Sequence, residues 1–245
     1  MRTSNPTLTA NTFTKPATVG EQRMTIQGTV NKTAILLTLA MATAIYAWNS
    51  FQANPASAWP LLIGGAISGF IVALVTAFKK EWAPVTAPIY ALCEGLFIGA
   101  ISAVYEARLQ GIVLQAGMLT FGTLFGLLAA YRSGWIRATE NFKLGVVAAT
   151  GGICLMYLVS WVLSLFGVNM SFLHGSGLLS IGISAFVVVI AALNLVLDFD
   201  FIEQGAQLGA PKYLEWYGAF GLLVTLVWLY IEILRLLLKL AGRRD

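Results

Sequence analysis

The chain has 245 residues, of which 58% are hydrophobic and only 11% are charged. A soluble domain carries roughly a quarter charged residues, so this composition excludes an ordinary water-soluble fold and indicates that lipid covers most of the surface. The net charge of +4 does not indicate nucleic-acid binding, because the Lys and Arg residues are spread over short loops and the two ends.

The first thirty residues have no apolar core and are rich in Thr, Asn, Ser and Pro. This composition does not fit a signal peptide, and it is typical of a segment that cannot bury enough apolar surface to fold. We therefore expect residues 1–30 to form a disordered cytoplasmic arm. Residues 31–245 are expected to form one transmembrane domain.

Seven apolar runs follow the arm, and each approaches the twenty or so residues that a helix needs to cross a bilayer. The loops between them are too short for a separate soluble domain, so the sequence predicts an all-α membrane protein, a seven-transmembrane helix bundle. Small residues recur four positions apart in three of the runs, at Gly65 and Gly69, Gly95 and Gly99, and Gly122 and Gly126. This spacing favours close helix packing. The runs are 33–50, 58–78, 86–105, 111–131, 144–166, 176–202 and 216–240.

The distribution of positive charge predicts the orientation of the first six runs. With the N-terminus inside, the inner segments carry ten Lys and Arg residues, against Arg108 alone outside, which follows the positive-inside rule. We expect a multi-pass protein of the inner cell membrane with a cytoplasmic N-terminus. The seventh run breaks the rule, because crossing would put Arg235, Lys239 and the C-terminal arginines outside. It is either re-entrant or inserted under constraint from the other six.

Four acidic residues lie within or at the end of apolar runs: Glu94, Asp198, Asp200 and Glu232. A carboxylate at the centre of a spanning helix costs about 2.5–3.5 kcal/mol, so each should face protein or water. Two positions correspond to about 200° around a helix, so only one of Asp198 and Asp200 can point into the bundle. Asp198 shares its face with Asn194, which places Asp198 inside and Asp200 at the interfacial rim.

The last run carries a stripe of small and polar residues on an otherwise apolar helix, and such a stripe favours contact with protein or water. Arg235 follows Glu232 by three positions and could pair with it; a simple ion pair near the helix end is an alternative to a functional site. For Glu94, a structural hydrogen bond and a functional role are both open. The stripe comprises Gly218, Gly221, Thr225, Trp228, Glu232, Arg235 and Lys239.

Three stretches resemble bacterial relatives of the Bax inhibitor (TMBIM, YccA-like) family. They are "GTVNKTAILLTLAMATAIYAW", "ALCEGLFIGAISAVYE" and, above all, "LNLVLDFDFIEQGAQLGAPKYLEWYGAFGLLVTLVWLYIEILRLL". The resemblance implies a fold in which the last helix is central and wrapped by the other six. It also implies a pH-sensitive calcium leak channel, in which an acid late in the sixth helix pairs with an acid in the seventh.

Carried onto this sequence, the resemblance assigns the pair to Asp198 and Glu232. The second acid is a Glu where the family usually has Asp, and Asp200 remains a rival to Asp198. Two carboxylates held close in a medium of low dielectric can share a proton. We expect the shared proton to tie the sixth helix to the seventh, and its loss to open a cation path.

In that path Asp198 and Glu232 would hold permeant calcium only weakly, because an ion that is bound tightly does not leave. Asn194 would add an oxygen ligand and Arg235 would compete for Glu232. We expect no tightly bound cofactor, with calcium and protons acting as permeant or gating ions, and a monomer in the lipid bilayer.

The alternative function is regulation of a membrane-anchored ATP-dependent protease, as the YccA-like resemblance implies, with the N-terminal arm as the point of contact. Enzymatic activity is not expected. An aspartyl intramembrane protease lacks its Gly-x-Gly-Asp motif here, and a serine type lacks a buried base, since the only histidine, His174, lies in a predicted loop. A proton-coupled transporter is disfavoured because the runs show no clear internal repeat.

Overall fold

The structure, a computed structural model, describes residues 22–167, 175 and 177–242. Within these residues the chain forms seven long helices, all long and apolar enough to cross a membrane. This confirms the predicted seven-helix, all-α membrane bundle. In chain order they are α1 (Ile26–Ala53), α2 (Ala58–Phe78), α3 (Ala83–Arg108), α4 (Ile112–Arg132), α5 (Glu140–Leu165), α7 (Leu178–Gln207) and α8 (Leu214–Ala241), with two short 3-10 helices, η2 (Pro55–Ser57) and η3 (Lys80–Trp82).

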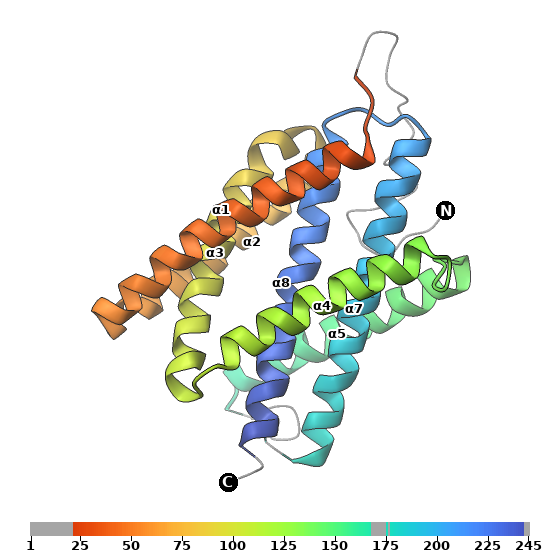
Figure 1. Ribbon diagram of the computed structural model, residues 1–245. Helices are drawn as coiled ribbons and strands as arrows, with labels where there is room; N and C mark the ends of the chain where they lie inside the picture. Colours follow the sequence, from red (N-terminus) through yellow and green to blue (C-terminus); the bar gives the residue numbers. More distant parts are fainter. Residues whose placement is uncertain (1–21, 168–174, 176, 243–245) are drawn as a thin grey trace.

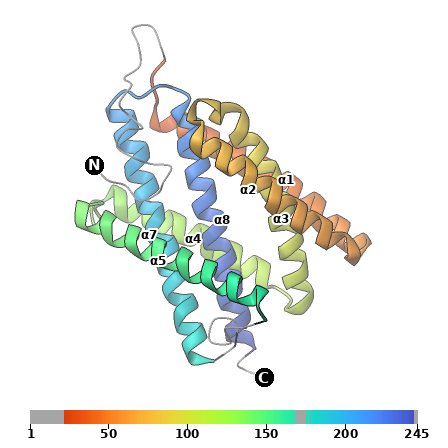
Figure 2. The ribbon, with the colours of Figure 1, turned by 180° about the vertical axis from the view of Figure 1, so that it is seen from behind.

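The last helix, α8, is the central one. Figures 1 and 2 show α1, α2 and α3 on one side of it and α4, α5 and α7 on the other. Over its most apolar 18 residues, 56% of α8 is buried, against 17% for α1, α2 and α5. Leu223 and Val227 pack with α1 and α3, whereas Leu226 and Leu229 pack with α4 and α7. Because protein surrounds α8 on several faces, its polar stripe avoids lipid.

The first helix begins earlier than its apolar run suggests. The Thr25 hydroxyl caps α1 by accepting a hydrogen bond from the Gly28 amide at 2.9 Å. The preceding residues 22–25, here called the N-terminal strap, pair with the α7–α8 turn: the Met24 amide donates to the Ala210 carbonyl at 2.7 Å. The expected boundary of the disordered arm at residue 30 is therefore wrong for residues 22–30. Residues 1–21 lie outside the described part of the chain.

Two of the three glycine pairs lie in close helix contacts. A Cβ added to Gly99 would lie 2.6 Å from the Cα of Ala44 on α1, and one added to Gly65 would lie 2.8 Å from the backbone nitrogen of Phe97 on α3. These distances are too short for any side chain, so the glycines let α1 and α2 pack directly on α3. Gly122 and Gly126 have nothing within 4 Å of an added Cβ, and the close packing predicted for this pair is wrong.

The final helix runs without interruption from Leu214 to Ala241. Its first residues lie beside the start of α1, because Glu215 binds both Thr25 and Lys32. At 1.5 Å per residue its 28 residues span about 42 Å, which is longer than the hydrocarbon core of a bilayer, about 30 Å. Of the two alternatives for this segment, the structure supports a helix that passes from one end of the bundle to the other.

Candidate functional site on the last two helices

Asp198 lies in the interior, as its position on α7 predicts. The residue is 3% exposed, and its Oδ2 has no hydrogen-bond partner among the described residues. It faces α8, where the Thr225 side chain approaches the carboxylate and a Cβ added to Gly221 would lie 3.8 Å from Oδ1. Buried polar groups are nearly always paired, so an unpaired carboxylate oxygen is a feature that calls for a functional explanation.

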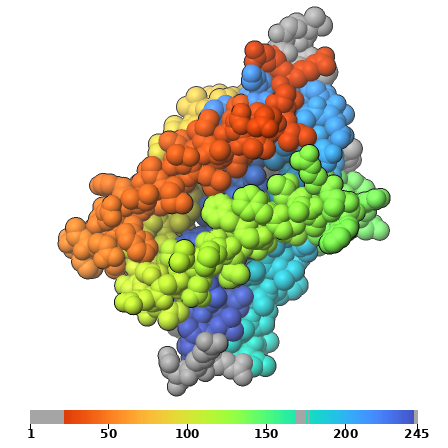
Figure 3. Space-filling model, in the orientation of Figure 1, coloured from red at the N-terminus to blue at the C-terminus, as the bar shows by residue number. Residues whose placement is uncertain are grey.

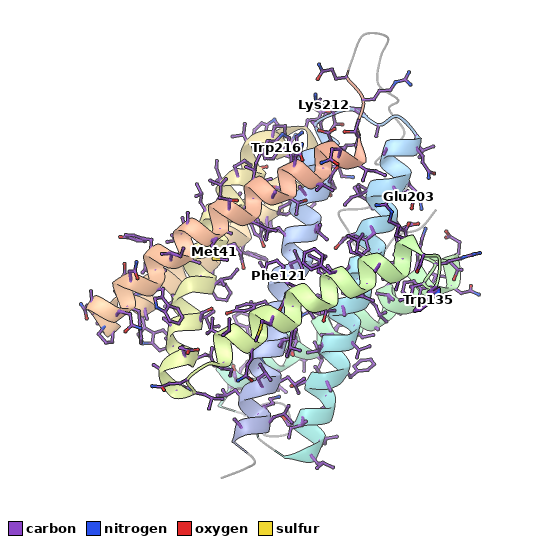
Figure 4. All side chains as sticks on the ribbon, viewed as in Figure 1. Met41, Phe121, Trp135, Glu203, Lys212 and Trp216 are labelled. Atoms are coloured by element: carbon purple, nitrogen blue, oxygen red, sulfur yellow. The ribbon has the colours of Figure 1, made fainter. Side chains whose placement is uncertain are left out.

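Asp200 points to a different side of α7, and its Oδ2 has two partners. Its Oδ2 lies 2.7 Å from Nζ of Lys143 on α5 and accepts a hydrogen bond from the Gln204 amide at 2.5 Å. Its side chain is 17% exposed, against 3% for Asp198, so Asp198 is the more buried of the two acids, as its helical position predicts. The sequence did not point to Lys143, since a lysine 57 positions away along the chain gives no local signal. One turn along, Glu203 (Figure 4) accepts a hydrogen bond from Tyr131 of α4 at 2.5 Å.

Glu232 forms a second site on α8. The Tyr157 hydroxyl of α5 lies 3.1 and 3.2 Å from the two carboxylate oxygens of Glu232, and Nη1 of Arg235 lies 3.0 Å from Oε1. Arg235 also donates to the Tyr157 hydroxyl at 2.7 Å and stacks over its ring. The alternative of an ion pair between Glu232 and Arg235 is therefore realised, with Tyr157 as a third member that links α5 to α8.

The two carboxylates predicted to share a proton do not hydrogen-bond to each other. Asp198 lies opposite Gly221 and Thr225, and seven residues, about 10 Å of helix, separate Thr225 from Glu232. The reason is the antiparallel register of α7 and α8, which also places Lys239 beside Ser184, near the start of α7. The expectation of a directly shared proton, and of calcium held jointly by both acids, is corrected in this respect.

The predicted supporting residues are dispersed. The Asn194 amide donates to the Thr150 hydroxyl of α5 at 2.9 Å and to the Ile190 carbonyl at 2.8 Å, so it extends the polar line of α7 toward α5. Glu94 on α3 is buried, contacts Tyr90 and lies against Gly69 of α2. This places Glu94 in the α2–α3 contact, outside the α7–α8 site.

The polar stripe of α8 faces protein along its length, as predicted. Gly218 contacts α1 and α7, Thr225 and Glu232 are buried, and near the end Lys239 donates to the Ser184 hydroxyl at 2.8 Å. Among the described residues, no three His, Cys, Asp or Glu side chains lie close enough together to hold a metal ion. His174 lies outside the described residues. The stripe is thus a line of polar groups in which Glu232 and Arg235 share Tyr157 and Lys239 has a separate partner, Ser184.

Sequence reasoning missed one buried acid, Glu215. It is 1% exposed, accepts hydrogen bonds from the Thr25 amide and hydroxyl at 2.9 and 3.0 Å, and forms an ion pair with Lys32. A Cβ added to Gly28 would lie 2.5 Å from Oε2 of Glu215 and closer still to Oε1, so a larger residue there would displace the carboxylate. The available signal was an acid in the first turn of a helix, where the helix dipole favours negative charge.

We expect Tyr157→Phe to weaken the α5–α8 contact. The change removes a hydroxyl that donates to Glu232 and accepts from Arg235, and a hydrogen bond to a charged group contributes about 1.5–3 kcal/mol. Because Arg235 is 36% exposed, water replaces part of the lost hydrogen bonding, and we expect a loss of stability at the lower end of this range. Thermal unfolding in detergent measures the change. Tyr46→Phe, on an exposed face of α1, is the control, and equal shifts for both variants would contradict the assigned role.

A comparison with known protein families agrees with the resemblance seen in the sequence. The family model described as Bax inhibitor 1 like matches residues 5–242. Comparisons with curated proteins and with solved structures found no match. The matched range contains every helix from α1 to α8, including both acidic sites. A multi-pass membrane protein with seven apolar helices is consistent with this match, and the chain therefore belongs to the Bax inhibitor 1 like family.

Proposed function

We propose that the protein is a pH-sensitive leak channel for cations, calcium among them, and that Asp198 is the group that senses pH and meets the ion. The observation that supports this is the buried Asp198 carboxylate, whose Oδ2 has no hydrogen-bond partner in the described part of the chain. Asp200 and Glu203 nearby both have partners. The unpaired oxygen is therefore the one that is free to take a proton or a cation.

The direction of the pH dependence follows from charge alone. An ionised carboxylate inside a membrane protein is costly unless a positive charge accompanies it. A proton and a cation compete for the same oxygen of Asp198, and only the ionised form attracts the cation. Flux should therefore rise as pH rises and fall as Asp198 becomes protonated. One carboxylate, the Thr225 hydroxyl and water would hold calcium weakly, as conduction requires.

The polar stripe of α8 supplies the remainder of the proposed path. From Gly221 and Thr225 it leads past Trp228 to Glu232, which is held by Tyr157 and Arg235. Trp228 is half-buried and packs against apolar residues of α5 and α7. An apolar constriction of this kind can gate conduction by excluding water. The two acids, Asp198 on α7 and Glu232 on α8, then act at successive levels along the length of α8 instead of as a pair.

Calcium flux into liposomes that contain only the purified protein, measured with an enclosed dye across a range of pH, tests the proposal. Wild-type protein should conduct increasingly as pH rises. Asp198→Asn cannot ionise, so its flux should be low and independent of pH. Asp200→Asn is the matched control on the same helix, and it should keep the pH dependence because Asp200 is already neutralised by Lys143.

Absence of flux through the wild-type protein would contradict the proposed channel. Flux with an unchanged pH profile in Asp198→Asn would contradict the role of Asp198.

We also propose that the protein lies in the inner membrane with its N-terminus in the cytoplasm, because α8 begins beside the strap and near η3, where Lys80 stacks over Tyr217. These cationic turns would then lie inside.

A further inference from the structure

A large groove opens on the side of the bundle between α1 and α4, away from both acidic sites. Its volume is about 710 Å³, within the range of small-molecule binding pockets. Figure 3 shows the hollow between these two helices, with atoms of α8 at its floor. We call it the lateral groove, and its lining includes Met41, Ala44, Ile98, Gly117, Phe121 and Leu226.

The lining of the lateral groove is apolar and carries no charge. Its polar side-chain groups are the hydroxyls of Ser102, Thr120 and Tyr230 and the indole N–H of Trp48. Ser102 and Tyr230 hydrogen-bond to each other at 2.7 Å, and the Thr120 hydroxyl donates to the Ala116 carbonyl at 2.7 Å. Since the three hydroxyls already have partners, the groove offers little to water, which needs two to four polar contacts to stay in a cavity. An ion or a polar ligand would find no counter-charge in it.

The mouth of the groove lies on the lipid-facing surface of two spanning helices. Met41 on α1 is 55% exposed, and Leu114 and Met118 on α4 are 68% and 60% exposed. Figure 4 shows Met41 and Phe121, which come from opposite sides of the groove. The groove is therefore continuous with the surface that meets the bilayer, and hydrocarbon is the medium at its mouth. Methionines at the rim suit a flexible apolar ligand, because their side chains adapt to irregular shapes.

We propose that the lateral groove binds one acyl chain of a bilayer lipid, which lies between α1 and α4 and touches α8. The space is kept open by small residues: a Cβ added to Gly117 would have no atom within 4 Å. Because the chain is already in hydrocarbon, its favourable free energy in the groove comes from van der Waals contacts with the lining side chains. The back of α8, formed there by Leu226, Val227 and Tyr230, is thereby covered by lipid instead of protein.

The test uses full-length protein in liposomes that contain a phospholipid with a photoreactive diazirine midway along one acyl chain. After illumination, mass spectrometry locates the adducts. Leu226 and Val227 are buried, so lipid that only surrounds the bundle does not reach them, whereas a chain in the groove does. We expect adducts on this part of α8, and adducts on the exposed Leu155 of α5 serve as the internal standard for surrounding lipid.

Gly117→Leu should fill the groove and reduce the α8 adducts about tenfold, because its side chain occupies the volume that the acyl chain would take. Gly122→Leu is the matched control: it lies on the same helix, also has open space around an added Cβ, and does not line the groove. It should label like wild type. If Gly117→Leu does not fold, Met118→Trp narrows the same mouth and should give the same loss.

Two results would overturn the proposal. One is the absence of adducts on α8 in the wild type, or adducts that persist in both groove variants while the α5 standard is constant. The other is occupation by a second copy of the chain, which would appear as crosslinks between cysteines placed at Met118 of two molecules. Because neither result depends on ion flux, failure here is distinguishable from failure of the proposed channel.

Discussion

Gly99→Ala is expected to separate α1 from α3, so that most of the protein molecules do not fold stably. An added Cβ would lie 2.6 Å from the Cα of Ala44 and 2.8 Å from its carbonyl carbon. These are backbone atoms, which cannot rotate away as a flexible side chain can, so α1 must move. Overpacking typically costs 1–3 kcal/mol, and a backbone clash of this kind is expected at about 3 kcal/mol or above. The yield of monodisperse protein and its thermal unfolding in detergent measure the effect.

The chain provides a sharp control for this change. Gly126 lies within α4 and has no atom within 4 Å of an added Cβ. Gly126→Ala should therefore be neutral or stabilising by up to about 1 kcal/mol, because alanine is the better helix former. If Gly99→Ala is tolerated as well as Gly126→Ala, the close contact between α1 and α3 is not formed as described.

Glu215→Ala is expected to release the start of α1 from α8. The change removes the partner of Lys32 and the acceptor of two hydrogen bonds from Thr25. Removing one member of a buried ion pair costs about 3–5 kcal/mol, and the 15% exposure of Lys32 places this case near 3 kcal/mol. Equilibrium unfolding in a denaturing detergent measures the loss, and proteolysis near residue 25 should become faster.

A second charge pair and a double variant test the cause. Glu140→Ala removes a partner of Lys143 at 3.5 Å, but Glu140 is 62% exposed, so the loss should be no more than about 1 kcal/mol. The double variant Glu215→Leu with Lys32→Met replaces the buried pair by apolar groups and should recover part of the stability. If the double variant is less stable than Glu215→Ala, the loss comes from altered packing and not from the unpaired lysine.

Most of the fold follows from the apolar runs. The predicted span 216–240 agrees with Leu214–Ala241, and 86–105 lies inside Ala83–Arg108. The first run predicts 33–50, yet α1 begins at Ile26, because the helix continues into polar residues that a hydropathy criterion excludes. Its start is fixed by Thr25 and by contacts with the α7–α8 turn. Those contacts join segments as much as 190 positions apart, which no local pattern reports.

The candidate site was also predicted in part: local spacing predicts some of its features, and contacts between helices determine the others. Helical spacing correctly separates Asp198 from Asp200, because both lie on one helix of known pitch. The relation of Asp198 to Glu232 depends on how far α7 slides along α8, and this register is set by the length of the turn and by side-chain packing. Spacing along one chain does not contain that information. The partners Tyr157 and Lys143, both on α5, were missed for the same reason.

The strap beside α8 also bears on how the protein is made. Lys32 near the beginning of the first span meets its counter-ion only when Glu215 has been synthesised, 183 positions later. Until then the first helix has a cationic end without this acidic partner. Completion of α8 fills the middle of the bundle and also supplies the carboxylate that neutralises Lys32 of α1. A chain that ends before Glu215 therefore leaves Lys32 without its ion pair and Thr25 without its hydrogen-bond acceptor.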